Sequence, residues 1–242
     1  MIYQTDKGYS TVNNTNDNAE HVSLAIPEYL QEVYHWAYLN ARNARLLDRE
    51  CVVTAILWGN SKRLRQAVLA EVTAGSNVLQ AAHVYGKLIP ELAKKIGADG
   101  ALEVIDIAPL QVSLCEKKLK GFSNSEVHIA DASALGSRKY DLVNCFFLLH
   151  EVPDDLKVKI INALLSQVAP KGKTVFVDYN EPHKWHPLRS PMQLIFRYLE
   201  PFADSLFYTN IQDMATSAAD FTWYKRTIFG GLYQITVATR ST

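Results

Sequence analysis

This sequence has no excess of positive or of negative charge. Its 242 residues include 25 Lys and Arg against 25 Asp and Glu, so the formal net charge is zero. A neutral chain has no overall attraction to nucleic acid or to anionic lipid, and no nucleic-acid partner is expected. Long hydrophobic runs are also missing, because no apolar stretch approaches the roughly 20 residues that span a bilayer. The first twenty residues lack the apolar core of a secretory signal, so we expect a cytoplasmic protein.

Cysteine is scarce and scattered. The three cysteines, Cys51, Cys115 and Cys145, are too far apart in sequence to form a compact metal-binding motif. Their odd number and apolar neighbours predict reduced, mostly buried thiols. A hydrophobic content of 48% with 21% charged residues is ordinary for a globular protein. The length suits one large domain, or a domain with an added cap.

The chain divides into three predicted parts. Residues 1–26 are rich in Asn and Thr and predict a flexible N-terminal arm. Residues 27–76 predict a helical cap, with helical spacing of apolar residues in 27–50, 51–60 and 61–72. In this cap Gly59 is expected to end one helix and Ser61 to be the N-cap of the next. Residues 77–242 predict the main domain.

Short apolar strands alternate with amphipathic helices from Asn77 onward. Strands are predicted at 77–82, 101–107, 125–131, 141–149 and 173–179. Helices are predicted at 85–97, 108–121, 132–135, 154–169 and 192–206. Residues 221–240 form two β runs around Gly230 and Gly231, which indicates a hairpin. The pattern predicts an α/β fold: a seven-stranded, mostly parallel Rossmann-like sheet with a terminal antiparallel hairpin.

Glycine is scarce at the end of the first predicted strand, where many α/β proteins concentrate it. The stretch VLQAAHVYGK, residues 78–87, contains only Gly86. A pyrophosphate needs the close backbone approach of a G-x-G-x-x-G loop, and His83, Val84 and Tyr85 crowd that approach. No G-K-[ST] sequence follows, so the P-loop pattern is absent too. The loop therefore favours a nucleoside ligand without phosphate.

Two acidic residues follow the next strands. Asp106 ends the second strand, twenty residues after Gly86, which suits an acceptor for both hydroxyls of a ribose. Asp131 ends the third strand, where its carboxylate could accept a hydrogen bond from the exocyclic amine of adenine. One acid for the sugar and one for the base predict a nucleoside pocket, and S-adenosylmethionine is a common ligand of this kind.

Residues 77–239 resemble a class I S-adenosylmethionine-dependent methyltransferase, including the final hairpin. VLQAAHVYG, FFLLHEVPDD, DYNEPHKWHPLR with LEPFA, and WAYLNARNARLLDR with ILWGN are similar to a narrower branch that includes the rhodoquinone-biosynthesis proteins. These proteins are built like methyltransferases and use S-adenosylmethionine as an amino donor to ubiquinone, with manganese. That branch has a tyrosine just before the ribose-binding aspartate, where this chain has Ile105. This departure favours methylation over amination.

The resemblance implies a set of cofactor contacts. Asp106 would hold the ribose, Asp131 would lie by the adenine, and the loop from Gln80 to Gly86 would face the methionine end. His83 could reach the methionine carboxylate. The full set of expected cofactor-binding residues is Gln80, Ala81, Ala82, His83, Tyr85, Gly86, Asp106, Ile107, Asp131 and Ala132.

Gln80 stands where most relatives carry an acid that helps to order the methionine amine. An uncharged amide holds an ammonium group less firmly than a carboxylate does. The exchange indicates a changed cofactor site, and it is compatible with transfer of the amine or of the methyl group.

The candidate catalytic residues are His150, Glu151, Tyr85 and His183. His150 and Glu151 follow the fourth strand, where His150 would position or deprotonate an acceptor hydroxyl. Alternatively, His150 packs at the strand end and Glu151 favourably starts the next helix. Tyr85 belongs to the cofactor loop itself.

The predicted loop after the fifth strand contains the one concentration of metal-type ligands in the sequence, Asp178, His183 and His186. These could bind Mn²⁺, or serve as base and substrate clamp. Alternatively, the loop is solvated and made rigid by prolines, with Trp185 packed underneath. Arg189 could pair with an acceptor oxygen or with Glu200.

Aromatic residues are plentiful outside the sheet. Tyr34, Trp36, Tyr38 and Trp58 could line an acceptor pocket with Phe196, Tyr198, Phe202 and Phe207 opposite, or could simply be core. We therefore expect a methyltransferase acting on a small, largely apolar, possibly quinone-like acceptor. The alternatives are an amino transfer to ubiquinone that gives rhodoquinone, with a divalent metal, and a non-catalytic S-adenosylmethionine-binding protein. Peripheral membrane contact would suit a quinone, and the oligomeric state stays open.

Overall fold

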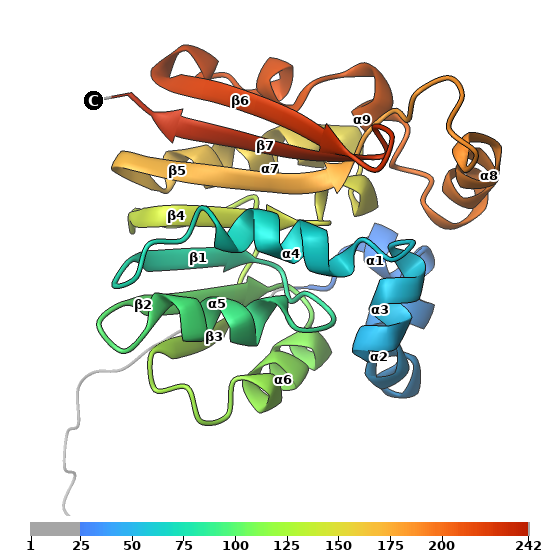
Figure 1. Cartoon of the computed structure of the whole chain (residues 1–242). Coiled ribbons are helices and arrows are strands. Elements are labelled where there is room, and N and C mark those ends of the chain that lie inside the picture. Colours follow the sequence, from blue (N-terminus) through green and yellow to red (C-terminus); the bar gives the residue numbers. More distant parts are fainter. Residues whose placement is uncertain (1–24, 242) are drawn as a thin grey trace, which may run out of the picture.

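A computed structural model describes residues 25–241, so nearly all of the predicted arm lies outside the described residues. Seven strands form one sheet in the order β3-β2-β1-β4-β5-β7-β6 (Figure 1). All neighbours from β3 to β5 are parallel. The strands are β1 (Asn77–Ala81), β2 (Ala101–Asp106), β3 (Ser125–Ile129), β4 (Tyr140–Phe146), β5 (Val168–Tyr179), β6 (Phe221–Ile228) and β7 (Tyr233–Arg240).

The terminal hairpin supplies the antiparallel part of the sheet. β7 lies between β5 and β6 and is antiparallel to both. The chain reverses through residues 229–232, where Gly230 and Gly231 adopt φ angles of +59° and +90°. Glycine adopts such angles without steric cost, so the Gly-Gly pair sets the position of the turn. The predicted α/β fold, a mostly parallel seven-stranded sheet with a terminal hairpin, is confirmed.

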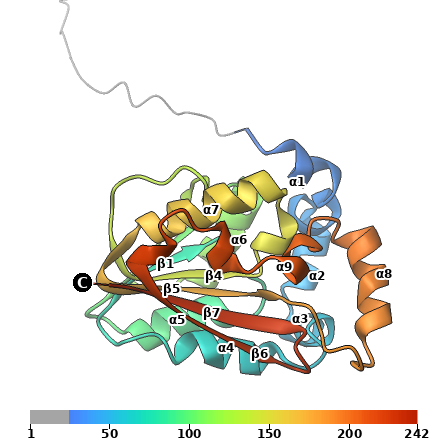
Figure 2. The same cartoon turned by 90° about the horizontal axis from the view of Figure 1, so that it is seen from above.

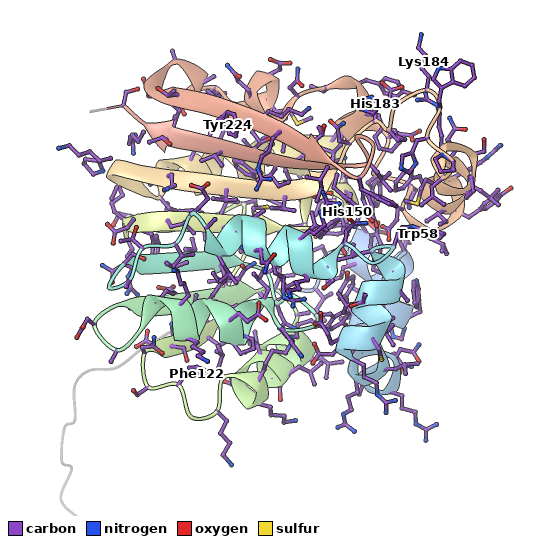
Figure 3. All side chains as sticks on the ribbon, in the orientation of Figure 1. Trp58, Phe122, His150, His183, Lys184 and Tyr224 are labelled. Carbon is purple, nitrogen blue, oxygen red and sulfur yellow. The ribbon has the colours of Figure 1, made fainter. Side chains whose placement is uncertain are left out.

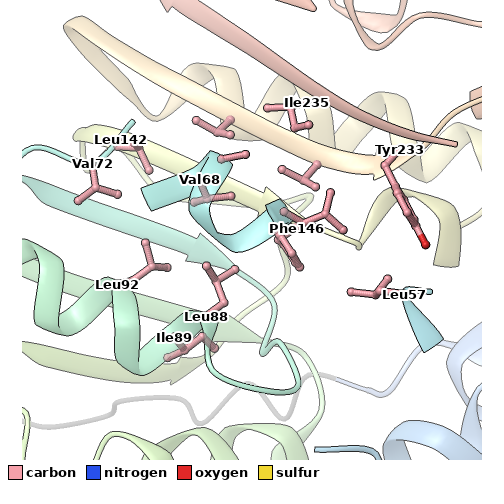
Figure 4. Packing of buried hydrophobic residues seen from close by; sticks show 14 of the residues in the cluster. Leu57, Val68, Val72, Leu88, Ile89, Leu92, Leu142, Phe146, Tyr233 and Ile235 are labelled. Atoms are coloured by element: carbon pink, nitrogen blue, oxygen red, sulfur yellow. The ribbon is translucent and has the colours of Figure 1, made fainter. Parts of the chain in front are cut away.

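Helices cover both faces of the sheet. On one face α4 (Ser61–Leu69), α5 (Leu88–Ile96) and α6 (Pro109–Lys118) share a hydrophobic core with the sheet. The opposite face is covered by α7 (Asp154–Ser166), whose buried side chains join a second core. Figure 2 shows α4 and α5 on one side of the strands and α7 on the other. Figure 4 shows the first core, with Val68, Leu88, Leu92 and Ile235 among its members.

The carboxyl ends of the parallel strands are covered by a cap of short helices. The cap comprises α1 (Glu28–Glu32), a π-helical turn (His35–Leu39), α2 (Ala41–Leu47) and α3 (Glu50–Ile56), and α8 (Arg189–Leu199) lies beside it (Figures 1 and 2). The remaining short elements are α9 (Ser205–Tyr208) and the 3₁₀ turns Leu149–Glu151, Ile211–Met214 and Ala218–Asp220. None of the helices in the described part of the chain is long and apolar enough to cross a bilayer.

Several predicted details of the cap differ in the structure. The helical pattern of 27–50 is broken at Asn40, whose side chain accepts hydrogen bonds from the backbone of Arg42 and Asn43 and so starts α2. Ser61 is the first helical residue rather than the N-cap, and its hydroxyl donates to Glu50. The predicted stop at Gly59 is confirmed by its φ of +80°. The helix that follows, α4, packs in the sheet core rather than over the strand ends.

The segment after β3 also differs from its prediction. Residues 132–135 form a turn instead of a helix: the carboxylate of Asp131 accepts from the backbone N–H of Ser133, and the backbone carbonyl of Asp131 accepts from the N–H of Ala134. The three cysteines are free thiols; Cys115 and Cys145 are buried, whereas Cys51 is exposed.

Candidate active site

A cavity of about 410 Å³ lies between the cap and the carboxyl ends of β1, β2 and β4. Open parallel sheets bind ligands at this edge, next to the point where strand order reverses. Here the reversal lies between β1 and β4, which are neighbours in the sheet. Figure 3 shows His150 and Trp58, two residues of its wall, at this end of the molecule.

Asp106 ends β2 and lines the cavity with little exposure of its own. Its two oxygens accept hydrogen bonds of 2.8 Å from the backbone N–H groups of His83 and Ala108. Burial raises the pKa of this carboxyl to about 6, although the N–H groups oppose the shift. A carboxylate has about four acceptor positions, so two remain for hydroxyl groups of a ligand in the cavity. This is the arrangement that a ribose site needs.

His83 lies on the cavity wall and has one ring nitrogen without a hydrogen-bond partner among the described residues. Its Nδ1 lies 2.8 Å from Oε1 of Gln111, whose amide nitrogen donates to the Tyr38 carbonyl and the Tyr85 hydroxyl. Nδ1 must therefore carry the proton, which leaves Nε2 as an acceptor. This Nε2 is buried and has no hydrogen-bond partner among the described residues. Burial and the charge of Lys118 lower the pKa of His83 to about 4, so the ring is neutral.

This protonation state corrects the expected role of His83. A neutral ring with a bare nitrogen accepts a hydrogen bond, whereas a carboxylate would require a donor. His83 is thus suited to an ammonium group rather than to a carboxylate. Gln111 fixes this tautomer through its side-chain oxygen. It is a buried residue of α6 that the sequence analysis did not identify as a site residue.

Tyr85 joins the cofactor loop to the cap. Its hydroxyl donates to the carbonyl of Ala37 at 2.8 Å, and its ring stacks on that of Tyr38 with centroids 5.6 Å apart. Because the hydroxyl is held by these bonds, Tyr85 is a wall of the cavity and a tether for the cap. Ala82, whose φ is +66°, also lines the cavity beside it.

Gln80, Ala81 and Gly86 do not line the cavity. The Gln80 side chain is fully buried, and its amide nitrogen donates to the carbonyls of Ala81 and Ala82. Its oxygen accepts from Asn144 on β4. Gln80 therefore stabilises the end of β1 through these hydrogen bonds, and none of its side-chain atoms is accessible to a cofactor. The backbone N–H of Gly86 is used by Asp48 of the cap, at 2.9 Å.

The other expected cofactor residues lie on the cavity wall. Ile107 follows Asp106, and Asp131 and Ala132 follow β3. One oxygen of Asp131 accepts from the backbone of Ser133 at 2.8 Å, which fixes the carboxylate toward the strand end. Asp131 is half-buried and retains acceptor capacity on its other oxygen.

His150 is the centre of a buried acid cluster. Its Nδ1 lies 2.9 Å from Oδ1 of Asp178, a close ion pair whose alignment is poor for a hydrogen bond. Its Nε2 lies 3.7 Å from Glu151 and 3.8 Å from Glu200. Burial lowers the pKa of His150, but the charges of Asp178 and Glu200 outweigh it and raise the pKa to about 9. His150 is therefore an imidazolium at neutral pH.

Two cap tyrosines hold the two glutamates of this cluster. The Tyr38 hydroxyl donates a short hydrogen bond to Glu151, and the Tyr34 hydroxyl donates to Glu200 at 2.8 Å. Burial raises the pKa of both carboxyl groups, and the charge of His150 opposes the shift. A carboxyl group with a raised pKa is suited to exchange a proton with a ligand near neutral pH. Glu200 was predicted only as a possible partner of Arg189.

The predicted metal ligands are not brought together. Asp178 is buried. Its carboxylate pairs with His150 and accepts hydrogen bonds from the backbone N–H groups of Leu149 and Tyr179. His183 is exposed, and His186 packs on Phe229. No group of three His, Cys, Asp or Glu side chains in residues 25–241 is arranged to hold a metal ion. The predicted grouping is therefore wrong, and His183 lies outside the cavity.

Two further predictions about this loop are wrong. Arg189 pairs with Glu181 at 2.8 Å and bonds the carbonyl of Pro182, so it does not pair with Glu200. Trp185 does not pack under the loop, because 95% of its side chain is exposed. The loop is held instead by backbone contact with the hairpin turn, where His183 donates to the carbonyl of Gly230.

The aromatic residues divide into two groups. The first set of predicted pocket residues lines the cavity as expected: Tyr34, Trp36, Tyr38 and Trp58. The set predicted opposite them does not: Phe196 and Phe207 pack on each other, Tyr198 is exposed and Phe202 packs on Tyr29. That side of the cavity is formed by Met192, Ile195 and Leu199 of α8. Helical spacing alone could not tell which face of α8 points inward.

Comparison with known proteins supports a methyltransferase domain. A family model described as a methyltransferase domain matches residues 78–172, less than half of the chain. Demethylmenaquinone methyltransferase of Bacillus subtilis is 30% identical over 150 residues, which cover 59% of this chain and 62% of that protein. The enzyme of the same name from Bacillus licheniformis is 26% identical over 157 residues, 64% of this chain and 63% of that protein. The chain thus matches somewhat less than two thirds of each relative.

Solved structures share the fold. An O-methyltransferase family protein from Burkholderia thailandensis superposes with a TM-score of 0.65 at 13% identity, covering 86% of this chain and 64% of that one. The N-methyltransferase NodS from Bradyrhizobium japonicum, in complex with S-adenosyl-L-homocysteine, gives a TM-score of 0.57 at 14% identity, covering 89% and 100%. The class I methyltransferase fold is therefore confirmed. The narrower resemblance to rhodoquinone-biosynthesis proteins stays a prediction.

Proposed function

We propose that the chain is an S-adenosylmethionine-dependent methyltransferase that acts on a small, largely apolar, quinone-like acceptor. One observation carries the proposal: a single cavity at the switch point of the sheet has a nucleoside-type polar end and an apolar end, joined by an acid–histidine cluster. The matched methyltransferase domain and the demethylmenaquinone methyltransferase relatives support the same reading.

The residues of the polar end fit the cofactor. Asp106 has free acceptor positions for the two ribose hydroxyls, and Asp131 retains one for the adenine amine. The orphaned Nε2 of His83 is an acceptor of the kind that the methionine ammonium requires. When bound, S-adenosylmethionine supplies a methyl group on a sulfonium, which is a good leaving group.

The protein's own contribution is alignment of the reactants and transfer of one proton. The cap and α8 form walls of the cavity and would hold the acceptor in line with the methyl group, which provides much of the rate of a transfer reaction. Glu151 lines the cavity, and burial raises its pKa to about 8; in its ionised form it would accept the proton released by an acceptor hydroxyl or ring carbon. His150, held as an imidazolium by Asp178, would stabilise the negative charge that develops on an acceptor oxygen.

The apolar end sets the class of acceptor. Phe146, Phe147 and Tyr179, at the ends of β4 and β5, line the cavity together with Leu57 of the cap and Met192 of α8. These residues bind flat or branched hydrocarbon but offer few hydrogen bonds, which disfavours sugars and nucleotides as acceptors. A quinol has a flat apolar body with one or two hydroxyl groups, and it matches this wall and the His150 cluster together.

The test is transfer of a labelled methyl group to a series of short-chain quinols. We expect label in the product only for quinols with an unmethylated hydroxyl or ring position. Glu151→Gln should lower turnover at least about a hundredfold, because a carboxamide cannot accept the proton. His183→Gln is the matched control, since His183 lies outside the cavity. Binding of the cofactor with no labelled product from any quinol would refute the proposed activity.

A further inference from the structure

We propose that the mouth of the cavity is a docking face for an anionic lipid bilayer, from which an acceptor with a long apolar chain would pass directly into the site. The identity of the passing molecule rests on the proposed function. The docking itself rests on exposed side chains and charges.

The rim of the cavity is apolar and open to solvent. Four residues line the cavity and are also strongly exposed: Trp36 at 46%, Ile56 at 49%, Trp58 at 40% and Leu199 at 48%. They come from the cap and from the end of α8. Large apolar side chains that are exposed together mark an interaction surface rather than a random scatter.

The helix α8 extends this rim. Its Met192 and Phe196 are buried, four residues apart, so they define the inward face. Its outward residues Leu194 and Tyr198 are 60% and 69% exposed, although an outward helical face is ordinarily polar. We call Trp36, Ile56, Trp58, Leu194, Tyr198 and Leu199 the mouth patch. Trp and Tyr at its edges are side chains that favour the boundary between lipid and water.

Helix α1 of the cap carries two exposed acids, Glu28 and Glu32, but the segment that follows is basic. Between residues 40 and 63, Arg42, Arg45, Arg49, Lys62 and Arg63 are exposed and form no ion pair within the described part of the chain. The acids of this segment are both engaged, Asp48 by Lys118 and Glu50 by Arg65. The segment from Lys184 to Leu199 contains no acid at all. Although the whole chain is neutral, the free exposed charges of residues 40–63 are therefore basic and outnumber the two exposed acids of α1.

This combination fits an anionic membrane surface better than a second copy of the chain. Basic residues beside the membrane attract anionic headgroups, while apolar and aromatic side chains enter the interface. A twofold dimer through the same patch would place arginines of one copy near those of the other. The views in Figures 1 and 2 agree that the cap and α8 occupy one end of the molecule, so a flat surface can reach both.

The first test is flotation of the full chain with vesicles of phosphatidylcholine, with and without about one third phosphatidylglycerol. We expect binding to the anionic vesicles, weakened by added salt. Leu194→Ser combined with Tyr198→Ser should lower that binding at least about tenfold, because neither residue can then insert. The matched control combines Val158→Ser on α7 with Tyr224→Ser on β6, two exposed apolar residues outside the mouth patch, and should bind like the parent. Figure 3 shows Tyr224 on β6.

Two charge-removing double variants separate the electrostatic contribution to vesicle binding from the apolar one. Arg42→Gln combined with Arg45→Gln should weaken binding to anionic vesicles by about fivefold for each arginine. Lys94→Gln combined with Lys95→Gln removes the same charge from α5, on the face of the sheet, and should have little effect. Equal binding by the parent and both mouth variants would overturn the proposal, as would a solution dimer that Leu194→Ser with Tyr198→Ser abolishes.

Titration of every variant with S-adenosylhomocysteine keeps this inference distinct from the proposed function. None of the substituted residues lines the cavity, so the affinity for this ligand should be unchanged in all of them. Loss of vesicle binding with intact ligand binding supports the docking face. Vesicle binding by a protein that binds no adenosyl ligand would leave the docking face standing and remove the proposed enzyme.

Discussion

The hydroxyl of Tyr34 in the cap donates a 2.8 Å hydrogen bond to the carboxylate of Glu200, 166 residues further along the chain. Tyr38 makes the corresponding bond to Glu151. Each glutamate beside His150 is therefore held by a tyrosine of the cap, and lifting the cap would break both hydrogen bonds. The acid cluster and the closure of the cavity depend on each other.

Tyr34→Phe tests this dependence. The substitution keeps the ring and removes one hydrogen bond to a buried carboxyl group, so the free energy of unfolding should fall by about 1 to 3 kcal/mol. Urea denaturation measures it. Tyr224→Phe removes an exposed hydroxyl and should change stability by less than about 0.5 kcal/mol. Equal stability of the two variants would show that the Tyr34 bond does not hold the cap.

Gln80→Glu tests the role of the altered cofactor loop. If Gln80 only replaced a ligand-binding acid, restoring an acid would be harmless. In the structure its amide nitrogen donates to two carbonyls, and a carboxylate would repel both in a dry interior. We expect a loss of at least about 2 kcal/mol in urea denaturation. Gln66→Glu, at an exposed position of α4, is the control and should lie within about 0.5 kcal/mol of the parent.

The affinity for S-adenosylhomocysteine should depend on pH through Asp106. Its pKa is raised to about 6, so the carboxylate that we propose as the acceptor for the ribose hydroxyls is lost as pH falls below 6. Kd should then rise by about tenfold for each further pH unit. For folding the sign is opposite: the protonated form favours the folded state, and this contribution is lost as pH rises through 6. Asp106→Asn should bind weakly with a flat profile, and an unchanged slope in this variant would assign the dependence elsewhere.

Stability at alkaline pH should report on His150. Its pKa is raised above the unfolded value, to about 9, so its ion pair with Asp178 stabilises the fold fully below pH 6.5. That stabilisation is lost as pH rises through 9. Denaturation measured from neutral pH to pH 10 should show the fall, and His150→Gln should flatten it. His183→Gln is the control: it removes an exposed histidine instead, and its stability should follow the parent curve.

Patterns that are local in sequence predicted the fold and part of the site. Alternating strands and helices gave the sheet, and the spacing from Gly86 to Asp106 placed a carboxylate at the correct strand end. Such patterns could not predict the direction in which individual side chains point. Gln80 lies on a strand whose side chains are buried on both faces, so its position did not reveal that it points away from the cavity.

Long-range contacts explain the remaining differences. Glu200 became a site residue because α8 returns to the cap, and Gln111 because its helix faces Tyr38. Neither contact leaves a signal in the residues around it. His183 was placed in a metal site because ligand-type residues were close in sequence, but Asp178 is buried at the end of β5 whereas His183 is exposed in the loop after it. Nearness in sequence after a strand does not give convergence in space.

Calorimetric titration of the full chain with S-adenosylhomocysteine tests the central claim most directly, with NADH as the control ligand and Asp106→Ala as the control variant. We predict one-to-one binding of S-adenosylhomocysteine, no binding of NADH, and an affinity at least about tenfold lower in Asp106→Ala, since the ribose hydroxyls lose their acceptor. Absence of binding, or equal binding by Asp106→Ala, would contradict the assignment of this cavity.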